Sequence, residues 1–276
     1  MSYFKLLGLT KEPFSTSPDP DFFYESSGHH ATLVRLMIEI RLKRGMSLVL
    51  GDVGLGKTTL SRKLYQMLRT RNDILFHMIL DPVEGSELSF LISLVRTFNL
   101  PVPQGPCQAL DCKDAIKKYL FQKGVDEGKT IVLVIDEGQK LDRAALEVLR
   151  TLLNYETNEY KLLQLVVFAQ MEFLPTVAGM RNLWDRISFK QALTPLDIAT
   201  TRDMIDFRLR QAGYCFSAPL FSDEAVAQIH AHAQGCPRRI AMLCHKALKA
   251  VVMQDNWIID DGLVQSVFHE ENLVGV

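Results

Sequence analysis

The feature that most constrains this chain is the segment Gly51–Thr58, with the sequence GDVGLGKT, which directly follows the apolar run Ser47–Leu50. It matches G-x-x-x-x-G-K-[ST] and stands where that pattern acts, between a strand and a helix. Glycines let backbone N–H groups wrap phosphates without collision from side chains, and the helix N-terminus adds partial positive charge. We expect Lys57 to reach the β- and γ-phosphates and the Thr58 hydroxyl to ligate Mg²⁺. The predicted ATP-binding residues are Gly51, Asp52, Val53, Gly54, Leu55, Gly56, Lys57 and Thr58.

Short apolar runs alternate with helical patterns up to about residue 195, which is typical of a parallel sheet built from strand-helix-strand units. Most runs are apolar at nearly every position, as expected of strands covered on both faces. The predicted strands are Ser47–Leu50, Ile74–Leu80, Thr130–Ile135, Leu162–Phe168 and Ile187–Leu193. The predicted helices are His29–Lys43, Thr58–Arg69, Glu87–Phe98, Asp111–Lys123 and Arg143–Thr157.

The sequence beyond Pro195 carries helical patterns and no strand pattern. We therefore predict three parts: an N-terminal segment with a helix at 1–44, an α/β core at 45–195 and an all-helical domain at 196–276. The helices predicted in the last part are Ile198–Ala212, Asp223–Ala233, Pro237–Gln254 and Asp261–Phe268.

The third predicted strand is followed directly by the carboxylate pair Asp136-Glu137. Asp136 is placed to hold Mg²⁺ through water, and Glu137 is placed to polarise the water that attacks the γ-phosphate. A P-loop kinase would not need a water-activating glutamate beside its metal-binding aspartate. The pair therefore favours hydrolysis, while the alternative is an Asp-Glu pair that caps the next turn.

Three further polar residues are candidates for sensing or stabilising the γ-phosphate. Gln170 follows the fourth strand, and it would lie near the γ-phosphate if that strand lies between the first and the third; otherwise it faces solvent at a strand end. Arg186 precedes the last strand and could project into a neighbouring subunit's nucleotide, although its spacing equally allows a surface ion pair. Arg238 lies in the first turn of a predicted helix, where the helix dipole disfavours a cation, so it either faces an anion or is exposed to solvent.

Charge and composition argue against several other functions. The net charge of −1 gives no overall attraction to nucleic acid or to an anionic membrane, although Arg41, Lys43 and Arg44 form a local basic cluster. The five cysteines, an odd number without a C-x-x-C pair, argue against a disulfide framework and a zinc ribbon. No apolar run approaches the roughly 20 residues that cross a bilayer, and the N-terminus has no signal-peptide pattern. We therefore expect a cytoplasmic protein, or one held at the inner membrane by a partner.

Together these motifs resemble those of the AAA+ ATPases, and within them the ExeA/GspA-like proteins associated with type II secretion, pilus and exopolysaccharide systems. The more family-specific match is the N-terminal pattern that starts at Pro13-Phe-Ser, continues through Pro18-Asp-Pro and runs past Tyr24 and Ser26 to His29. The matching stretches then span nearly the whole chain. They are Gly51–Thr59, Ile135–Leu141, Leu146–Asn154, Lys161–Val166 and Gly235–Ile240.

The resemblance implies an α/β fold of the P-loop NTPase class, with a parallel five-stranded sheet in the order 5-1-4-3-2 and a C-terminal helical lid. It implies that the segment with Phe23 and Tyr24 packs near the adenine base, and it adds Thr59 to the nucleotide-binding residues. Membrane-anchored members carry a transmembrane helix and a cell-wall-binding domain after the ATPase. Neither is recognisable here, so a role in passage through peptidoglycan does not carry over directly.

The resemblance also implies roles for the three γ-phosphate candidates in a homo-oligomer such as a ring. Gln170 would be sensor 1, Arg238 would be sensor 2 and Arg186 would be a finger acting in trans. Asp185 stands before this arginine, where the family usually has an uncharged residue, and could pair with it.

Three functions fit these observations. The first is an oligomeric ATPase that assembles or remodels a secretion, pilus or polysaccharide-export complex, with a membrane-complex partner. The second is an ATP-dependent DNA-binding regulator resembling the transposition ATPases, which the near-neutral charge counts against. The third is a nucleotide-binding switch with negligible turnover, which Glu137 counts against. We favour the first.

Overall fold

The computed structural model describes residues 3–15, 19–83, 85–102, 108–216, 218–253 and 257–274. Pro18 of the N-terminal pattern and Gln254, the predicted end of one helix, lie outside these residues. The chain forms two compact units, here called the sheet unit (Gly28–Val53 and Leu60–Leu193) and the helical unit (Met1–Ser27, Gly54–Thr59 and Thr194–Val276). The division into parts at 1–44, 45–195 and 196–276 stays a prediction about domains.

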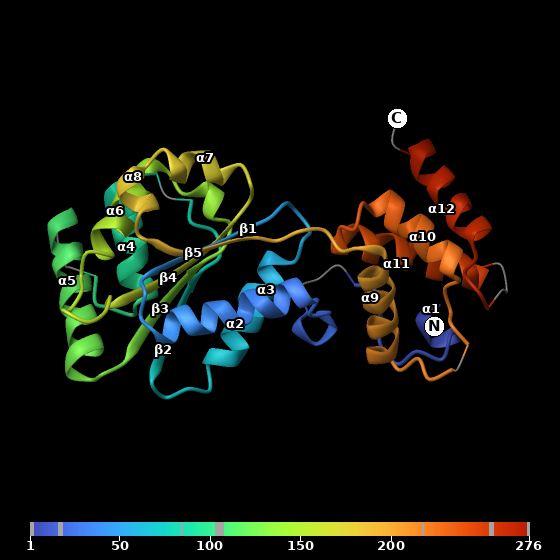
Figure 1. Cartoon of the computed structure of the whole chain (residues 1–276), viewed down its shortest axis with the longest axis horizontal. Helices are drawn as coiled ribbons and strands as arrows, with labels where there is room; N and C mark the ends of the chain where they lie inside the picture. The colour runs from blue at the N-terminus through green and yellow to red at the C-terminus, as the bar shows by residue number, and fades with distance from the viewer. Residues whose placement is uncertain are drawn as a thin grey trace. The chain divides into compact units, whose positions relative to one another are not determined.

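The sheet has five strands in the order β2-β3-β4-β1-β5, and each pair of neighbours is parallel (Figure 1). Read from the other edge, this is the predicted order 5-1-4-3-2, which is therefore confirmed. The order places β1 and β3 on either side of β4. Because the strands are parallel, the segments that follow these three strands all leave from the carboxyl ends of the strands, on the same side. The strands are β1 (Met46–Leu50), β2 (Ile74–Ile79), β3 (Thr130–Ile135), β4 (Leu163–Ala169) and β5 (Ile187–Ala192).

Helices around the sheet begin and end within two residues of the predicted positions, except at the end of α6. Figure 1 shows α2 and α3 on one side of the sheet and α4 and α6 on the other. These helices are α2 (Ser27–Arg41), α3 (Lys57–Leu68), α4 (Glu87–Thr97), α5 (Ala109–Phe121) and α6 (Arg143–Leu152), with a π-helical turn η2 (Gln122–Asp126) before β3 and a 3-10 turn η3 (Gly138–Lys140) after it.

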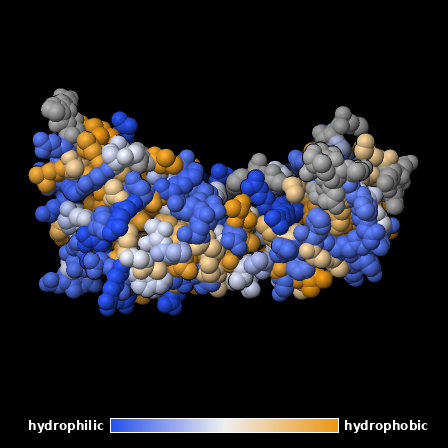
Figure 2. All heavy atoms as spheres, turned by 90° about the horizontal axis from the view of Figure 1, so that it is seen from above, coloured by the Kyte–Doolittle hydropathy of each residue, from blue (hydrophilic) through white to orange (hydrophobic). Residues whose placement is uncertain are grey.

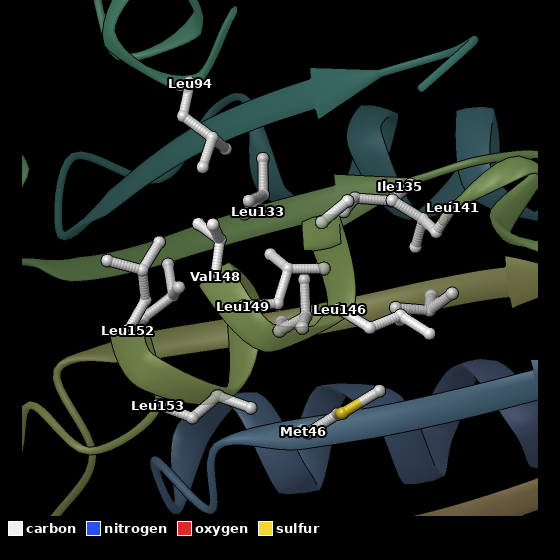
Figure 3. Packing of buried hydrophobic residues seen from close by; sticks show 14 of the residues in the cluster. Met46, Leu94, Leu133, Ile135, Leu141, Leu146, Val148, Leu149, Leu152 and Leu153 are labelled. Atoms are coloured by element: carbon white, nitrogen blue, oxygen red, sulfur yellow. The ribbon is translucent and has the colours of Figure 1, made fainter. Parts of the chain in front are cut away.

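Helix α6 covers the centre of the sheet with one apolar stripe. Leu146 and Leu149 have no exposed surface and lie over Leu133 and Ile135 of β3 (Figure 3). Side chains three residues apart share one face of a helix, which is why α6 buries its leucines together. This packing fixes the segment between β3 and α6 at both of its ends.

The prediction that the helix from Arg143 continues to Thr157 is wrong, because α6 ends at Leu152. The chain beyond it turns back toward β4: the Tyr155 carbonyl accepts from the Leu162 N–H at 3.0 Å. These backbone groups pair across the turn rather than along a helix. The short helices α7 (Phe173–Ala178) and α8 (Arg181–Trp184) between β4 and β5 were not predicted, since each is too short to show a period.

A half-buried histidine on β2 joins two helices to the sheet. One ring nitrogen of His77 lies 2.9 Å from the Thr97 carbonyl at the end of α4, and the other lies 2.9 Å from the Tyr119 hydroxyl on α5. Burial lowers the pKa of His77, against a smaller opposite effect of the hydrogen bond to Thr97. Burial also raises the pKa of Tyr119 to about 12. The folded chain therefore favours a neutral imidazole here.

The helical unit has its own apolar core, to which the N-terminal segment contributes Leu7, Leu9, Phe14 and Phe22. The sequence predicted its four main helices, but the last one continues to Val274, beyond the predicted end at Phe268, because no glycine or proline interrupts this stretch. They are α9 (Ile198–Gln211), α10 (Asp223–Ala233), α11 (Pro237–Met253) and α12 (Asp261–Val274), to which the N-terminal segment adds α1 (Tyr3–Leu6) and the 3-10 turn η1 (Pro20–Phe22).

One buried arginine holds the N-terminal segment to α9. The guanidinium of Arg208 donates to the carbonyls of Pro13 and Ser15, both at 2.8 Å, and lies over the rings of Phe14 and Phe22 at 5.9 Å. Burial lowers the pKa of Arg208. The carbonyls of Pro13 and Ser15 are thus satisfied from inside the core.

Hydrophilic and hydrophobic residues are interspersed over the face shown in Figure 2. Within the described ranges, every helix is too short or too polar to span a lipid bilayer.

Candidate nucleotide-binding and catalytic site

The phosphate loop connects β1 to α3 and has the backbone form that its glycines predict. The Gly51 N–H donates to the Ala169 carbonyl at 3.1 Å, which extends the β1–β4 pairing one residue past the end of β1. Gly54 and Gly56 have φ of +88° and +94°, where an L side chain is strained. Positive φ at these two glycines, with Leu55 between them, curls the backbone, so that successive N–H groups can face one anion. Residues Gly51–Gly56 therefore have the local form of a phosphate cradle.

Lys57 begins α3 and is buried, with 7% of its surface exposed. It stands at a helix N-terminus, where anions bind. Thr58 follows it with a half-exposed hydroxyl side chain. Hydroxyl and carboxylate oxygens are the ligands that Mg²⁺ prefers, and Asp136 supplies a carboxylate in the other motif. These residue types suit a magnesium–nucleotide complex, and their joint binding of one stays a prediction.

Gly54 also makes room for the first turn of α11. A Cβ on Gly54 would lie 2.7 Å from Cys236 Sγ and 2.9 Å from Arg238 Cβ, closer than such atoms approach one another. The Arg238 N–H donates to the Gly54 carbonyl at 3.2 Å. These residues all belong to the helical unit, and the Arg238 side chain is exposed. The structure thus brings the predicted sensor arginine to the phosphate loop, and its role as sensor stays a prediction.

The carboxylate pair lies at the carboxyl end of β3. Asp136 is 2% exposed, and its N–H donates to the Ile79 carbonyl of β2 at 2.8 Å. Its carboxylate accepts from the Glu137 N–H at 3.0 Å. Glu137 has φ +54°, in the left-handed region that favours glycine, and its side chain is partly exposed. The backbone therefore turns sharply between the predicted metal ligand and the predicted base.

Gln139 connects the end of β3 to the end of β4. Its Nε2 donates to Glu137 Oε2 at 2.6 Å, and its Oε1 accepts from the Gln170 N–H at 3.1 Å. The structure therefore brings Gln170 to within one side chain of Glu137, as the predicted strand order requires. Whether Gln170 contacts a γ-phosphate stays a prediction.

Arg186 lies between α8 and β5, where it donates to the Asn182 carbonyl and, at 2.7 Å, to Asn154 Oδ1. The pairing with Asp185 that the sequence allowed is absent from the ion pairs of the described residues. Both partners of Arg186 observed among the described residues are neutral groups. Its action on a neighbouring subunit stays a prediction.

Tyr24, one of the two aromatic residues predicted near the adenine base, contacts α9. The Tyr24 ring lies 5.7 Å from the Phe207 ring, and the Tyr24 hydroxyl donates to Asp203 Oδ2 at 3.5 Å. Burial and, second, the charge of Asp203 raise the pKa of Tyr24. These residues line an open pocket of ≈ 440 Å³ together with Arg210. Phe23 is half-buried, and contact of either aromatic residue with adenine stays a prediction.

Sequence reasoning assigned no role to Gln139, Gly138 or Arg208. Gln139 stood inside a matching motif, and its distance of two residues from Glu137 was a usable signal. Arg208 stands four residues after Met204 on the apolar face of α9, where a charged residue is unusual. Gly138 had no local signal, because what it contacts comes from β4.

Comparisons with known proteins identify a matching family and a relative of this chain. A family model described as AAA domain matches residues 40–177. Protein A of the general secretion pathway of Aeromonas hydrophila is 35% identical over 277 residues, which cover 97% of this chain and 48% of that protein. The chain thus spans about half the length of this curated relative.

Solved structures with a similar fold include Cdc6p of Pyrobaculum aerophilum, with a TM-score of 0.70 and 16% identity over 96% of this chain and 73% of that one. The ORC1 protein of Aeropyrum pernix in complex with DNA has a TM-score of 0.65 and 17% identity over 94% and 69%. The RuvB branch-migration motor of Thermotoga maritima has a TM-score of 0.60 and 17% identity over 90% and 72%. At identities this low, the similarity shows a shared fold and nothing more.

Proposed function

Because the chain belongs to the AAA domain family of P-loop ATPases, we propose that it hydrolyses ATP to ADP and phosphate with Mg²⁺. We further propose that hydrolysis drives assembly or remodelling of a secretion, pilus or polysaccharide-export complex. The observation that carries the hydrolytic step is Glu137, a carboxylate held at the end of β3 directly after the buried Asp136.

The proposed chemistry divides between the two motifs. The Gly51–Gly56 backbone and Lys57 bind the phosphates, while Thr58 and Asp136 hold Mg²⁺, which neutralises charge on the phosphate oxygens when bound. Glu137 accepts the proton of the attacking water, so that a new P–O bond forms as the bond from the γ-phosphorus to ADP breaks. Thr59, Phe23 and Tyr24 complete the proposed nucleotide contacts.

Three residues tie the proposed turnover to nucleotide state and to a second subunit. Gln170 and Arg238 act as sensors, and Arg186 stabilises charge in the nucleotide of a neighbouring subunit of a homo-oligomer. An arginine finger contributes on the order of 10³–10⁵ in rate. Turnover per subunit should therefore rise with protein concentration in the wild type and stay flat in Arg186→Ala.

The pathway proposal rests on the similarity to the Aeromonas protein, whose name refers to general secretion. It makes a membrane-bound complex the partner and places the chain in the cytoplasm or at the inner membrane through that partner. DNA is the second candidate, favoured by the fold shared with a protein solved in complex with DNA. The net charge of −1 counts against it.

The test of hydrolysis uses two variants with matched controls. Lys57→Ala should abolish binding of a fluorescent ATP analogue, while Glu137→Gln should bind it and lose turnover by roughly 10²-fold or more. Lys117→Ala and Glu159→Gln, at exposed positions of the sheet unit, should behave as wild type. Wild-type ATPase in Glu137→Gln would overturn the general-base assignment.

The test of the partner uses Glu137→Gln loaded with ATP as a trap. The variant is used for capture from membranes and lysate, with and without nuclease, and Lys57→Ala serves as the nucleotide-free control. ATP-dependent capture of secretion-complex components that survives nuclease supports the first candidate. Capture of nuclease-sensitive DNA alone supports the second.

A further inference from the structure

The side-chain amide of Gln139 donates one hydrogen bond and accepts another, and its orientation follows from the chemistry of the two partners. The Glu137 carboxylate only accepts, so the amide nitrogen must face it, at 2.6 Å. The Gln170 N–H only donates, so the amide oxygen must face that group, at 3.1 Å. A flipped amide would break both hydrogen bonds. A side chain of this length with one donor end and one acceptor end is therefore specifically required.

The backbone around this bridge limits how the Glu137 carboxylate can be placed. Glu137 has φ +54°, which an L residue adopts only where its surroundings hold it. Gly138 presses against β4, since a Cβ there would lie 2.4 Å from Val167 Cγ1. The loop backbone is thus fixed on β4, whereas the Glu137 side chain is partly exposed and can rotate about its own bonds. The bond from Gln139 selects one of these orientations.

We infer that Gln139 is a positioning residue, which holds the Glu137 carboxylate for water activation and ties it to the backbone at the end of β4. The inference rests on the proposed hydrolysis by Glu137 and deepens it. Gln139 touches neither nucleotide nor water in this role. Gln139 also couples the position of Gln170 to that of Glu137, because any shift of the Gln170 backbone moves the amide that holds the Glu137 carboxylate.

The test compares two replacements of Gln139 that keep its size. Q139E keeps the oxygen toward Gln170 but faces Glu137 with a second carboxylate, and Q139L removes both hydrogen bonds. Each should keep the Kd for a fluorescent ATP analogue and the KM for ATP within about twofold and lower kcat by roughly 10- to 100-fold, part of what a general base supplies. Q122L, at an exposed glutamine before β3, is the matched control and should keep wild-type kcat.

The split between kcat and binding separates positioning from a structural effect. Loss of positioning should lower kcat and leave the KM, the Kd and the thermal stability near their wild-type values. A merely structural effect would change all four together.

Either variant with kcat within twofold of wild type overturns the inference. So does a loss of Kd or thermal stability that parallels the loss of kcat. The proposed function fails differently: wild-type protein would then lack ATPase, or Glu137→Gln would retain it.

Discussion

Replacing Gly138 with alanine should weaken the sheet unit and its predicted ATPase together. An added Cβ would lie 2.4 Å from Val167 Cγ1, 3.2 Å from the Phe168 carbonyl oxygen and 3.3 Å from Ala169 Cβ. Val167 and Ala169 are fully buried in β4, so neither can move into solvent. The loop must instead move away from the strand and carry Glu137 with it.

The size of the effect follows from this clash. Gly138 does not have positive φ, so its replacement adds steric cost without backbone strain. Inserting a carbon into a well-packed interior costs about 1–3 kcal/mol of unfolding free energy. For a domain of this size, that lowers Tm by roughly 2–12 °C. A loop displaced by a few tenths of an ångström also disturbs the bond from Gln139 to Glu137, so kcat should fall by at least roughly tenfold.

The assay is urea denaturation of Gly138→Ala followed by circular dichroism, with ATPase measured at a temperature where the variant is folded. Gly85→Ala is the matched control, because a Cβ there meets nothing within 4 Å and φ is not positive. It should stay within about 0.5 kcal/mol of wild type. If Gly138→Ala were as stable and as active as Gly85→Ala, the proposed packing of the loop on β4 would be refuted.

Three further substitutions test other parts of the structure. Arg208→Leu removes the donors to the Pro13 and Ser15 carbonyls, so it should lower the unfolding free energy, measured in urea, by about 2–4 kcal/mol. It should also speed proteolysis near the N-terminus, and unchanged proteolysis would contradict the anchoring role. Gly54→Ala combines strain at φ +88° with the clash against α11 and should weaken ATP-analogue binding more than tenfold, whereas retained affinity would show that the loop tolerates a side chain. The lowered pKa of His77 means that the unfolded chain binds its proton first, so unfolding free energy should fall as pH drops below about 6.5. That loss should be smaller in His77→Gln, and equal pH slopes would refute the assignment.

Local patterns predicted the elements around the site because their signals are contained in short windows. The phosphate loop needs its glycines, lysine and threonine at fixed offsets, so Gly51–Thr58 was visible without any contact information. Buried strands such as β3 show as apolar runs, and their ends place Asp136 and Glu137. The end of α6 was mispredicted because the pairing between Tyr155 and Leu162 competes with helix and involves residues beyond the helical window.

Side-chain partners could not be predicted in the same way, because they come from distant parts of the chain. Arg208 is separated from Pro13 by 195 residues and Gln170 from Gln139 by 31, and no spacing rule connects either pair. The roles of Gln170, Arg186 and Arg238 came from resemblance, and the structure adds their immediate surroundings.

The sequence by itself determined that this chain carries a phosphate loop and an acidic pair on a parallel sheet, since local backbone demands and strand hydrophobicity are written in consecutive residues. The tertiary structure alone decided how the Glu137 carboxylate is held. That depends on the packing of Gly138 against β4 and on an amide placed between two strands that are adjacent only in the folded sheet.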